Sequence, residues 1–230
     1  MIELFGNKYL KYLHNLMRIL EIFCGTKSIS KIFEKNGWEV YTIDIEKKFN
    51  PTECIDILEW NYTKFDKDYF NHIHLSPPCI FMSQNQQSWY GRYKGRGVNK
   101  YLFTKEIHLE RLIDSDILLH KCIEILDYFN NNTFTIENPY HTKFNNISKR
   151  NIFNYDYSIV DYCMYNHPIK KPTIFYNNFN LELNKCDKSH KHVRWCDYTN
   201  GNSKLDGRYM LPEDLCIEIF NQVDKYLNKK

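Results

Sequence analysis

Residues 18–44 read RILEIFCGTKSISKIFEKNGWEVYTID, and this stretch decides the fold. A short apolar run over 19–23 ends at Cys24-Gly25, which is typical of a strand followed by a turn. A helical pattern follows and a glycine closes it. A second strand is then expected over 38–43, ending in Asp44. The stretch therefore predicts a strand–helix–strand unit.

The same alternation continues along the chain. Further elements are expected as strands over 54–57, 72–75, 133–136, 159–165 and 173–176, and as helices over 109–129 and from Pro212. Strands that alternate with helices are typical of an α/β domain, with a mostly parallel sheet and helices on both faces. We therefore expect a Rossmann-like fold.

Four polar side chains lie at or just after expected strand ends, and these are Asp44, Asp56, Cys79 and Glu137. In open α/β sheets, ligands bind beyond the carboxyl ends of the strands. The sequence therefore predicts that the four side chains converge on one site.

Length, composition and charge limit the possible classes of protein. The 230 residues and 43% hydrophobic content suit one domain with a core, and the net charge of +3 does not by itself indicate a nucleic-acid-binding protein. Basic residues gather among aromatic ones in one stretch, which holds Arg92, Lys94, Arg96, Lys100 and Lys105 beside Trp89, Tyr90 and Tyr93. This stretch is either a phosphate-contacting loop or a solvated surface loop.

The eight cysteines do not indicate secretion. The first apolar stretch is interrupted by Lys8, Lys11 and His14, and no apolar run approaches the roughly 20 residues that cross a bilayer. We expect a soluble, intracellular protein with reduced cysteines, in the cytoplasm of a prokaryotic host or at a site of viral replication.

Gly25 and two acidic residues suit a nucleoside cofactor. A glycine after the first strand allows a cofactor to approach the backbone closely, although such a glycine is more often only a turn. Asp44 can accept hydrogen bonds from both ribose hydroxyls, and Asp56 can accept one from an adenine amino group.

Two motifs carry chemical side chains. The first motif is Ser76-Pro77-Pro78-Cys79, in which the prolines stiffen the backbone and expose the cysteine. The alternative interpretation is a buried cysteine in a proline turn. The second motif is Glu137-Asn138-Pro139, in which partial desolvation of the glutamate carboxyl group would raise its pKa. The alternative interpretation is a glutamate that caps a helix.

These motifs resemble those of a known family. Pro-Pro-Cys and Glu-Asn-Pro resemble motifs IV and VI of the cytosine-5 DNA methyltransferases, and Phe23-Cys24-Gly25-Thr26 resembles motif I. The resemblance covers roughly residues 18–178 and looks most like small phage- and virus-type members. It implies the fold of S-adenosylmethionine-dependent methyltransferases and methyl transfer from S-adenosylmethionine to carbon-5 of cytosine in double-stranded DNA.

The resemblance also implies a covalent mechanism on a flipped cytosine, with Cys79 as nucleophile, Glu137 as its acid partner and Lys171 beside the base. It implies cofactor binding by Phe23, Gly25, Asp44, Ile45, Asp56, Ile57 and Pro78. For nucleic-acid binding we expect Ser83, Arg92, Lys94, Arg96 and Lys100.

The chain departs from the family pattern in three places. Lys27 stands where a second motif I glycine is expected, and Lys171 and Thr173 stand where paired arginines are expected. Lysine keeps the positive charge but loses the planar fork of arginine. A clear Gly-Asn pair for the C-terminal motifs is missing.

The expected organisation is a catalytic core over 1–178, a reduced target-recognition segment over 179–206 and a C-terminal helix over 207–230 that returns to the core. The recognition segment holds four zinc-type side chains, namely Cys186, His190, His192 and Cys196. Their spacing matches no standard finger, so solvated histidines are favoured and no metal is expected.

Two alternatives stay open. The first is the same chemistry on RNA, because a small branch of the family methylates tRNA. The second is a catalytically silent nucleic-acid-binding module, which the presence of Cys79 and Glu137 disfavours. We expect a monomer without a membrane partner.

Overall fold

A computed structural model of the chain describes residues 16–80, 88–95, 97–130, 132–140, 154–193 and 210–229. Within these residues, a seven-stranded sheet has the order β3-β2-β1-β4-β7-β9-β8. Its strands are β1 (Arg18–Ile22), β2 (Glu39–Asp44), β3 (Glu53–Cys54), β4 (His72–Leu75), β7 (Thr133–Pro139), β8 (Asp156–Asp161) and β9 (Pro172–Asn177).

Helices and a small hairpin complete the described fold. The α-helices are α2 (Ser28–Lys35), α3 (Lys105–Tyr128) and α6 (Glu213–Leu227), and the hairpin pairs β5 (Tyr93–Lys94) with β6 (Tyr101–Leu102). Four short 3₁₀ helices are η1 (Lys47–Phe49), η2 (Tyr62–Lys64), η4 (Gly97–Asn99) and η5 (Tyr162–Met164).

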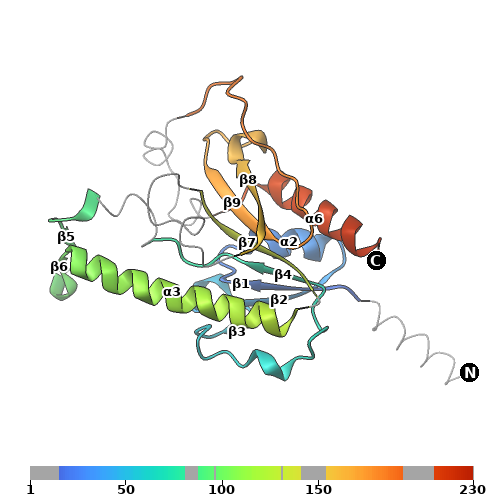
Figure 1. Cartoon of the computed structure of the whole chain (residues 1–230), viewed down its shortest axis with the longest axis horizontal. Coiled ribbons are helices and arrows are strands. Elements are labelled where there is room, and N and C mark those ends of the chain that lie inside the picture. The colour runs from blue at the N-terminus through green and yellow to red at the C-terminus, as the bar shows by residue number, and fades with distance from the viewer. Residues whose placement is uncertain are drawn as a thin grey trace, which may run out of the picture.

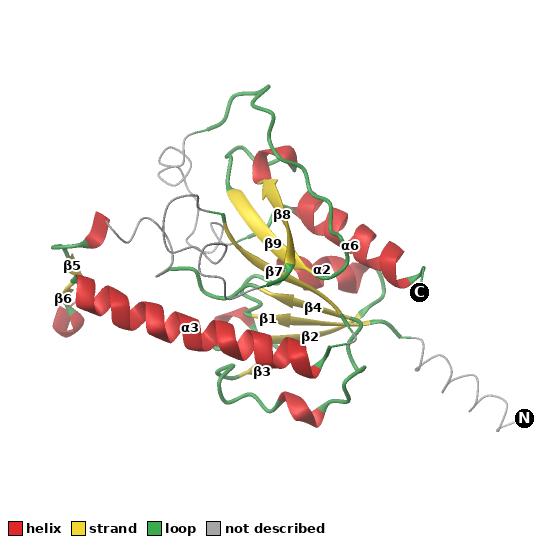
Figure 2. Ribbon diagram, in the orientation of Figure 1, coloured by secondary structure: helices red, strands yellow, loops and turns green. Residues whose placement is uncertain are grey.

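The sheet is mostly parallel. β1 runs parallel to β2 and β4, and β4 runs parallel to β7, with Ile22 opposite Ile43 and Leu75, and Leu75 opposite Ile136. β9 is antiparallel to both of its neighbours. The carboxyl ends of β1, β2, β4 and β7 therefore share one edge (Figure 2). The Rossmann-like fold predicted from the alternating pattern is confirmed.

The sheet is buried on both faces. α3 covers one face, and α2 and α6 cover the other (Figure 1). One apolar cluster joins the strands to Leu119, Cys122 and Ile125 of α3. A second cluster joins α2 to α6 and includes Phe33 and Leu215. Burial on both faces explains why the strands are almost continuously apolar in sequence.

Several element ends differ from the sequence expectation. α3 begins at Lys105 rather than near 109, because the Thr104 side chain accepts a hydrogen bond from the Ile107 N–H at 3.3 Å and caps the helix. β7 continues through Pro139, because its last residues pair with β9. Glu137 therefore lies within the strand, opposite Phe175, and not after it.

None of the helices in the described ranges is long and apolar enough to cross a membrane.

Candidate active site

The loop after β4 holds Cys79 at the carboxyl edge of the sheet. The Ser76 N–H donates to the Ile22 carbonyl of β1 at 3.2 Å, which fixes the start of the loop. Asn138 is buried on β7, and its Nδ2 donates to the Pro77 carbonyl at 3.0 Å. This bond joins the Pro-Pro-Cys segment to the Glu-Asn-Pro segment. Cys79 is left half-buried at the end of the loop.

Hydrogen bonds among buried polar side chains also hold the start of this loop. His74 of β4 is fully buried, and its ring nitrogens form hydrogen bonds with Thr135 Oγ1 at 2.8 Å and with Ser76 Oγ at 3.0 Å. Burial lowers the pKa of His74 to about 3, so the ring is neutral. Sequence reasoning missed this residue, although His72 and His74 alternate with apolar residues in a buried strand.

Cys79 and Glu137 share one electrostatic environment. Burial, and to a smaller extent the negative charge of Glu137, raise the pKa of the Cys79 thiol to about 11. Burial likewise raises the pKa of the Glu137 carboxyl group. The Lys171 ammonium lowers both pKa values, so its charge acts on both groups. The structure therefore brings together the three residues expected at the catalytic site.

The side chain of Tyr162 contacts Lys171. The Lys171 Nζ lies 3.5 Å from the Tyr162 hydroxyl and 4.7 Å from the centre of its ring. Tyr162 is buried, and burial followed by the Glu137 charge raises its pKa well above the ordinary value. Thr173, at the expected second arginine position, hydrogen-bonds to Tyr162. Sequence reasoning missed Tyr162, because only the folded chain brings it to Lys171.

The cofactor side of the edge is built around Asp44. Its Oδ2 accepts a hydrogen bond from the Gly25 N–H at 2.8 Å, and its Oδ1 accepts one from the Glu46 N–H at 2.8 Å. The carboxylate thus joins the loop after β1 to the turn after β2. Each oxygen keeps a second lone pair that a ribose hydroxyl can use.

The loop after β1 adopts an unusual backbone. Phe23, Gly25 and Lys27 have φ values of 58°, 45° and 59°. Lys27 thus keeps the left-handed conformation of the glycine expected there, at a cost of about 1 kcal/mol or more. Its Nζ donates to the Asn50 carbonyl, which ties the loop to the segment after β2.

Other expected cofactor residues lie in different settings. Ile45 exposes 64% of its surface and offers an apolar face beside Asp44. Asp56 caps a turn, since its Oδ1 accepts from the Leu58 N–H at 3.0 Å. Ile57 is buried in the core, so only its backbone can contribute to a ligand site. Pro78 is exposed beside Cys79.

The basic stretch forms the β5–β6 hairpin at the start of α3, on the side toward which the parallel strands point (Figure 1). Arg92 is exposed there. Lys94 Nζ lies 3.9 Å from the Trp89 ring centre, and Lys100 Nζ lies 4.6 Å from that of Tyr93. These contacts hold two cations on aromatic supports.

Three expected site residues, Ser83, Arg96 and Cys196, lie outside the described residues.

The order of the strands, with the one reversed strand β9, defines the class of fold, that of the Rossmann-like methyltransferases. Among solved structures, the Entamoeba histolytica methyltransferase EhMeth is similar, with a TM-score of 0.50 and 17% sequence identity. The likeness covers 83% of this chain and 62% of that chain, and at this identity it concerns the fold alone.

In sequence, the chain is 33% identical over 152 residues to a protein of Frog virus 3 (isolate Goorha) named "Probable DNA (cytosine-5)-methyltransferase". The match covers 65% of this chain and 64% of that protein, so the chain spans less than two thirds of its relative. No protein-family model matches. The chain is thus similar in sequence to a protein named as a cytosine-5 DNA methyltransferase, in agreement with the resemblance read from its motifs.

Proposed function

We propose that the protein transfers a methyl group from S-adenosylmethionine to carbon-5 of cytosine in DNA. The observation that carries this proposal is the joint placement of Cys79, Glu137 and Lys171 at the carboxyl edge of the sheet, where their charges act on one another. The kinship with a viral protein of that name supports the choice of substrate.

The residues around Asp44 fit a nucleoside cofactor. The remaining lone pairs of its carboxylate suit the ribose hydroxyls, and the exposed Ile45 suits one face of the adenine. Asp56 is half-exposed and can accept from the adenine amino group. S-adenosylmethionine supplies an electrophilic methyl group when bound.

Cys79 and Glu137 activate the cytosine. The target base is flipped out of the duplex, because its ring carbons cannot be reached in the stack. The Cys79 sulfur bonds to carbon-6 while ring nitrogen 3 takes a proton from Glu137, and the enamine that forms makes carbon-5 nucleophilic. Carbon-5 would then take the methyl group of S-adenosylmethionine, whose sulfonium–methyl bond would break and whose thioether product would leave. Loss of the carbon-5 proton to water, expulsion of the Cys79 sulfur and return of the nitrogen proton to Glu137 restore the aromatic ring.

The shifted pKa values of Glu137 and Cys79 bear on their roles as acid and nucleophile, respectively. Burial raises the pKa of Glu137 above its ordinary value, and this shift favours the protonated form that can donate a proton. Cys79 rests as a thiol, since its pKa is about 11, and must lose its proton as it attacks. Lys171 assists, because its charge favours the thiolate.

The β5–β6 hairpin is the proposed contact with phosphates. Lys94 belongs to β5, Arg92 directly precedes this strand and Lys100 directly precedes β6. The hairpin lies on the side of the molecule toward which the parallel strands point (Figure 1). Contacts to phosphates position a protein on DNA without reading its sequence. Base recognition then belongs to the segment over 179–206.

Incubation of the full chain with labelled S-adenosylmethionine and either duplex DNA or tRNA tests the function, with bisulfite sequencing to identify the base. We expect label in DNA at cytosine carbon-5. Label in RNA alone would refute the substrate, and no label in either would support the silent module.

DNA that contains 5-fluorocytosine tests the nucleophile. The fluorine cannot leave as a proton does, so wild type should form an adduct that survives a denaturing gel. Cys79→Ala should lose this adduct. Cys54→Ala is the control for a second, exposed thiol. Its sulfur donates to the Ile45 carbonyl at 3.5 Å, beside the proposed cofactor residues, so calorimetry should check that this variant still binds S-adenosylmethionine. An adduct in Cys79→Ala would assign the nucleophile to another residue.

A further inference from the structure

Four metal-type side chains from the segments after β8 and β9 converge on one another. Cys163, Cys186, His190 and His192 each offer one ligand atom, and these atoms all lie within 4.8 Å of one another. Cys163 belongs to η5, which follows β8, whereas the other three belong to the loop after β9. The sequence pattern had placed Cys196 with the loop residues, and the fold supplies Cys163.

The spacing of these atoms fits one tetrahedral ion. Zinc binds cysteine sulfur at about 2.3 Å and histidine nitrogen at about 2.0–2.1 Å, so its ligand atoms lie roughly 3.3–3.8 Å apart. The Cys186 Sγ and the His192 Nε2 are 3.3 Å apart. The ring centres of His190 and His192 are 4.7 Å apart. Small side-chain movements therefore suffice to close the set around an ion.

We propose that Cys163, Cys186, His190 and His192 bind a structural zinc ion. Two thiolates and two imidazoles form a set that zinc prefers over magnesium or calcium. Four protein ligands leave no open position, so the ion has no catalytic role of its own. Both thiols release a proton as the ion binds.

The backbone after Cys186 forms a tight turn of the kind that can bring metal ligands together. Lys188 adopts a left-handed conformation with φ 66°, and its N–H donates to the Cys186 sulfur at 3.3 Å. The turn is closed further by the Ser189 N–H, which donates to Asp187 Oδ1 at 2.8 Å. This tight turn brings His190 back toward Cys186. Hydrogen bonds to ligand atoms commonly orient and stabilise metal ligands.

The loop is attached to the core on both sides of the cluster. Before it, the Cys186 N–H donates to Asp161 Oδ2 at 2.9 Å. After it, the Val193 N–H donates to the Pro168 carbonyl at 2.9 Å. The ligands thus sit on a scaffold that the β8 end and the connection to β9 already define. A preformed scaffold reduces the ordering cost of binding the ion.

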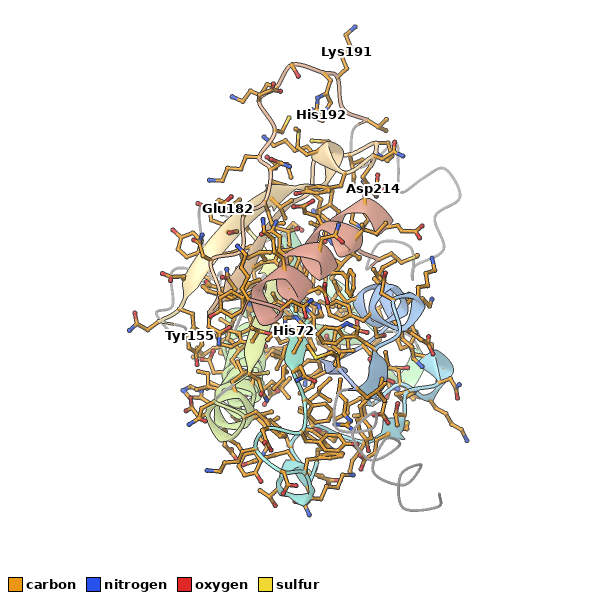
Figure 3. All side chains as sticks on the ribbon, turned by 90° about the vertical axis from the view of Figure 1, so that its right-hand side faces the viewer. His72, Tyr155, Glu182, Lys191, His192 and Asp214 are labelled. Carbon is orange, nitrogen blue, oxygen red and sulfur yellow. The ribbon has the colours of Figure 1, made fainter. Side chains whose placement is uncertain are left out.

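Zinc would supply the stability that this loop lacks. The described residues 178–193 contain no helix or strand, and none after Leu181 is buried. Figure 3 shows His192 and Lys191 at one end of the molecule, far from His72 in its middle. A polar segment of this kind cannot be held by apolar burial, and a metal can replace the missing core.

The ion would have two consequences for the chain. It would fix the base of the 179–206 segment, with the exposed Lys185, Lys188 and Lys191 around it. It would also fix η5, in which Tyr162 directly precedes Cys163 and contacts Lys171. The proposal does not depend on methyl transfer, because metal content is measured directly.

Elemental analysis of the full chain, purified without chelators or a histidine tag, tests the proposal. We expect about one zinc per chain. Cys163→Ser and His190→Ala should lose most of it, whereas Cys54→Ser and Lys191→Ala should keep it as matched controls. His190 is exposed, so its substitution should not unfold the core. Circular dichroism checks that each variant stays folded.

Cobalt substitution gives a second readout on the wild-type chain. Tetrahedral Co²⁺ with two thiolates should show visible bands and a sulfur-to-metal charge-transfer band, and these should disappear when zinc is added back. A wild-type chain without zinc or cobalt binding would overturn the proposal. Full zinc content in Cys163→Ser would overturn the role of Cys163, and an intact mass showing a Cys163–Cys186 disulfide would overturn the metal site.

Discussion

Replacing Glu21 with glutamine should remove part of the pH dependence of stability. Glu21 lies on β1 with only 3% of its surface exposed, and its Oε2 accepts a hydrogen bond from the Ser30 N–H of α2 at 3.1 Å. Burial raises the pKa of Glu21 from 4.5 to about 7, against the smaller opposing effect of its hydrogen bonds to Ser30. Glutamine keeps the shape and the acceptor oxygen but cannot ionise.

The size of the effect follows from the shift. The folded state retains the Glu21 proton between pH 4.5 and about 7, a range in which the unfolded chain has released it. The free energy of unfolding therefore falls as the pH rises through this window. At about 1.4 kcal/mol for each pKa unit, the loss reaches roughly 3 kcal/mol. Stability from this group is fully present below the unfolded pKa and is lost as the pH passes the folded one.

Urea unfolding of wild type and Glu21→Gln, followed by tryptophan fluorescence at several pH values, measures this loss. From about pH 5 to about pH 8, the variant should gain roughly 2.5 kcal/mol relative to wild type. Other titrating groups are common to both proteins and cancel in the difference. Glu34→Gln, at an exposed position of α2, is the matched control. A wild-type-to-variant difference that stays constant with pH would refute the reasoning.

Four further predictions concern the site. Lys27→Gly should raise the free energy of unfolding by about 1 kcal/mol in urea, because glycine adopts φ 59° without strain, and a loss instead would show that the Lys27 side chain matters more. Asn138→Ala should leave the Pro77 carbonyl without its donor, cost about 1–3 kcal/mol and slow adduct formation, while calorimetry shows unchanged cofactor affinity. Asp44→Ala should weaken S-adenosylmethionine binding roughly ten- to a hundred-fold in calorimetry, and unchanged affinity would contradict the ribose contact. The rate of adduct formation should rise with pH above neutrality, because the pKa of Cys79 is about 11, and a flat profile would contradict attack by a resting thiol.

The sequence was sufficient to predict the mostly parallel sheet and the residues at its carboxyl edge. Apolar runs that end in glycine, proline or acidic residues mark buried parallel strands, and the carboxyl ends of such strands meet by topology. This is why Asp44, Asp56, Cys79 and Glu137 could be assigned to one edge from the sequence alone. The end of β7 was less predictable, because it depends on pairing with β9.

Other residues were beyond sequence reasoning for a physical reason. Tyr162 and Cys163 were expected in a strand over 159–165, but they form η5 after β8, and their partners lie elsewhere in the chain. The burial of the Glu21 carboxyl group depends on the packing of α2 over β1. Such contacts depend on tertiary structure, whereas spacing along one chain reports only local periodicity.

The reversed direction of β9 has a consequence for how the site can change. Because β9 runs against β7, its first residues lie opposite Pro139, at the edge where the other strands end. Lys171, directly before β9, therefore arrives at that edge from the opposite direction to Cys79 and Glu137. The position of the Lys171 side chain thus depends on the connection from η5 and not on the register of the sheet. A change in the length or attachment of this connection can therefore move the Lys171 charge, while the segments that hold Cys79 and Glu137 stay unchanged.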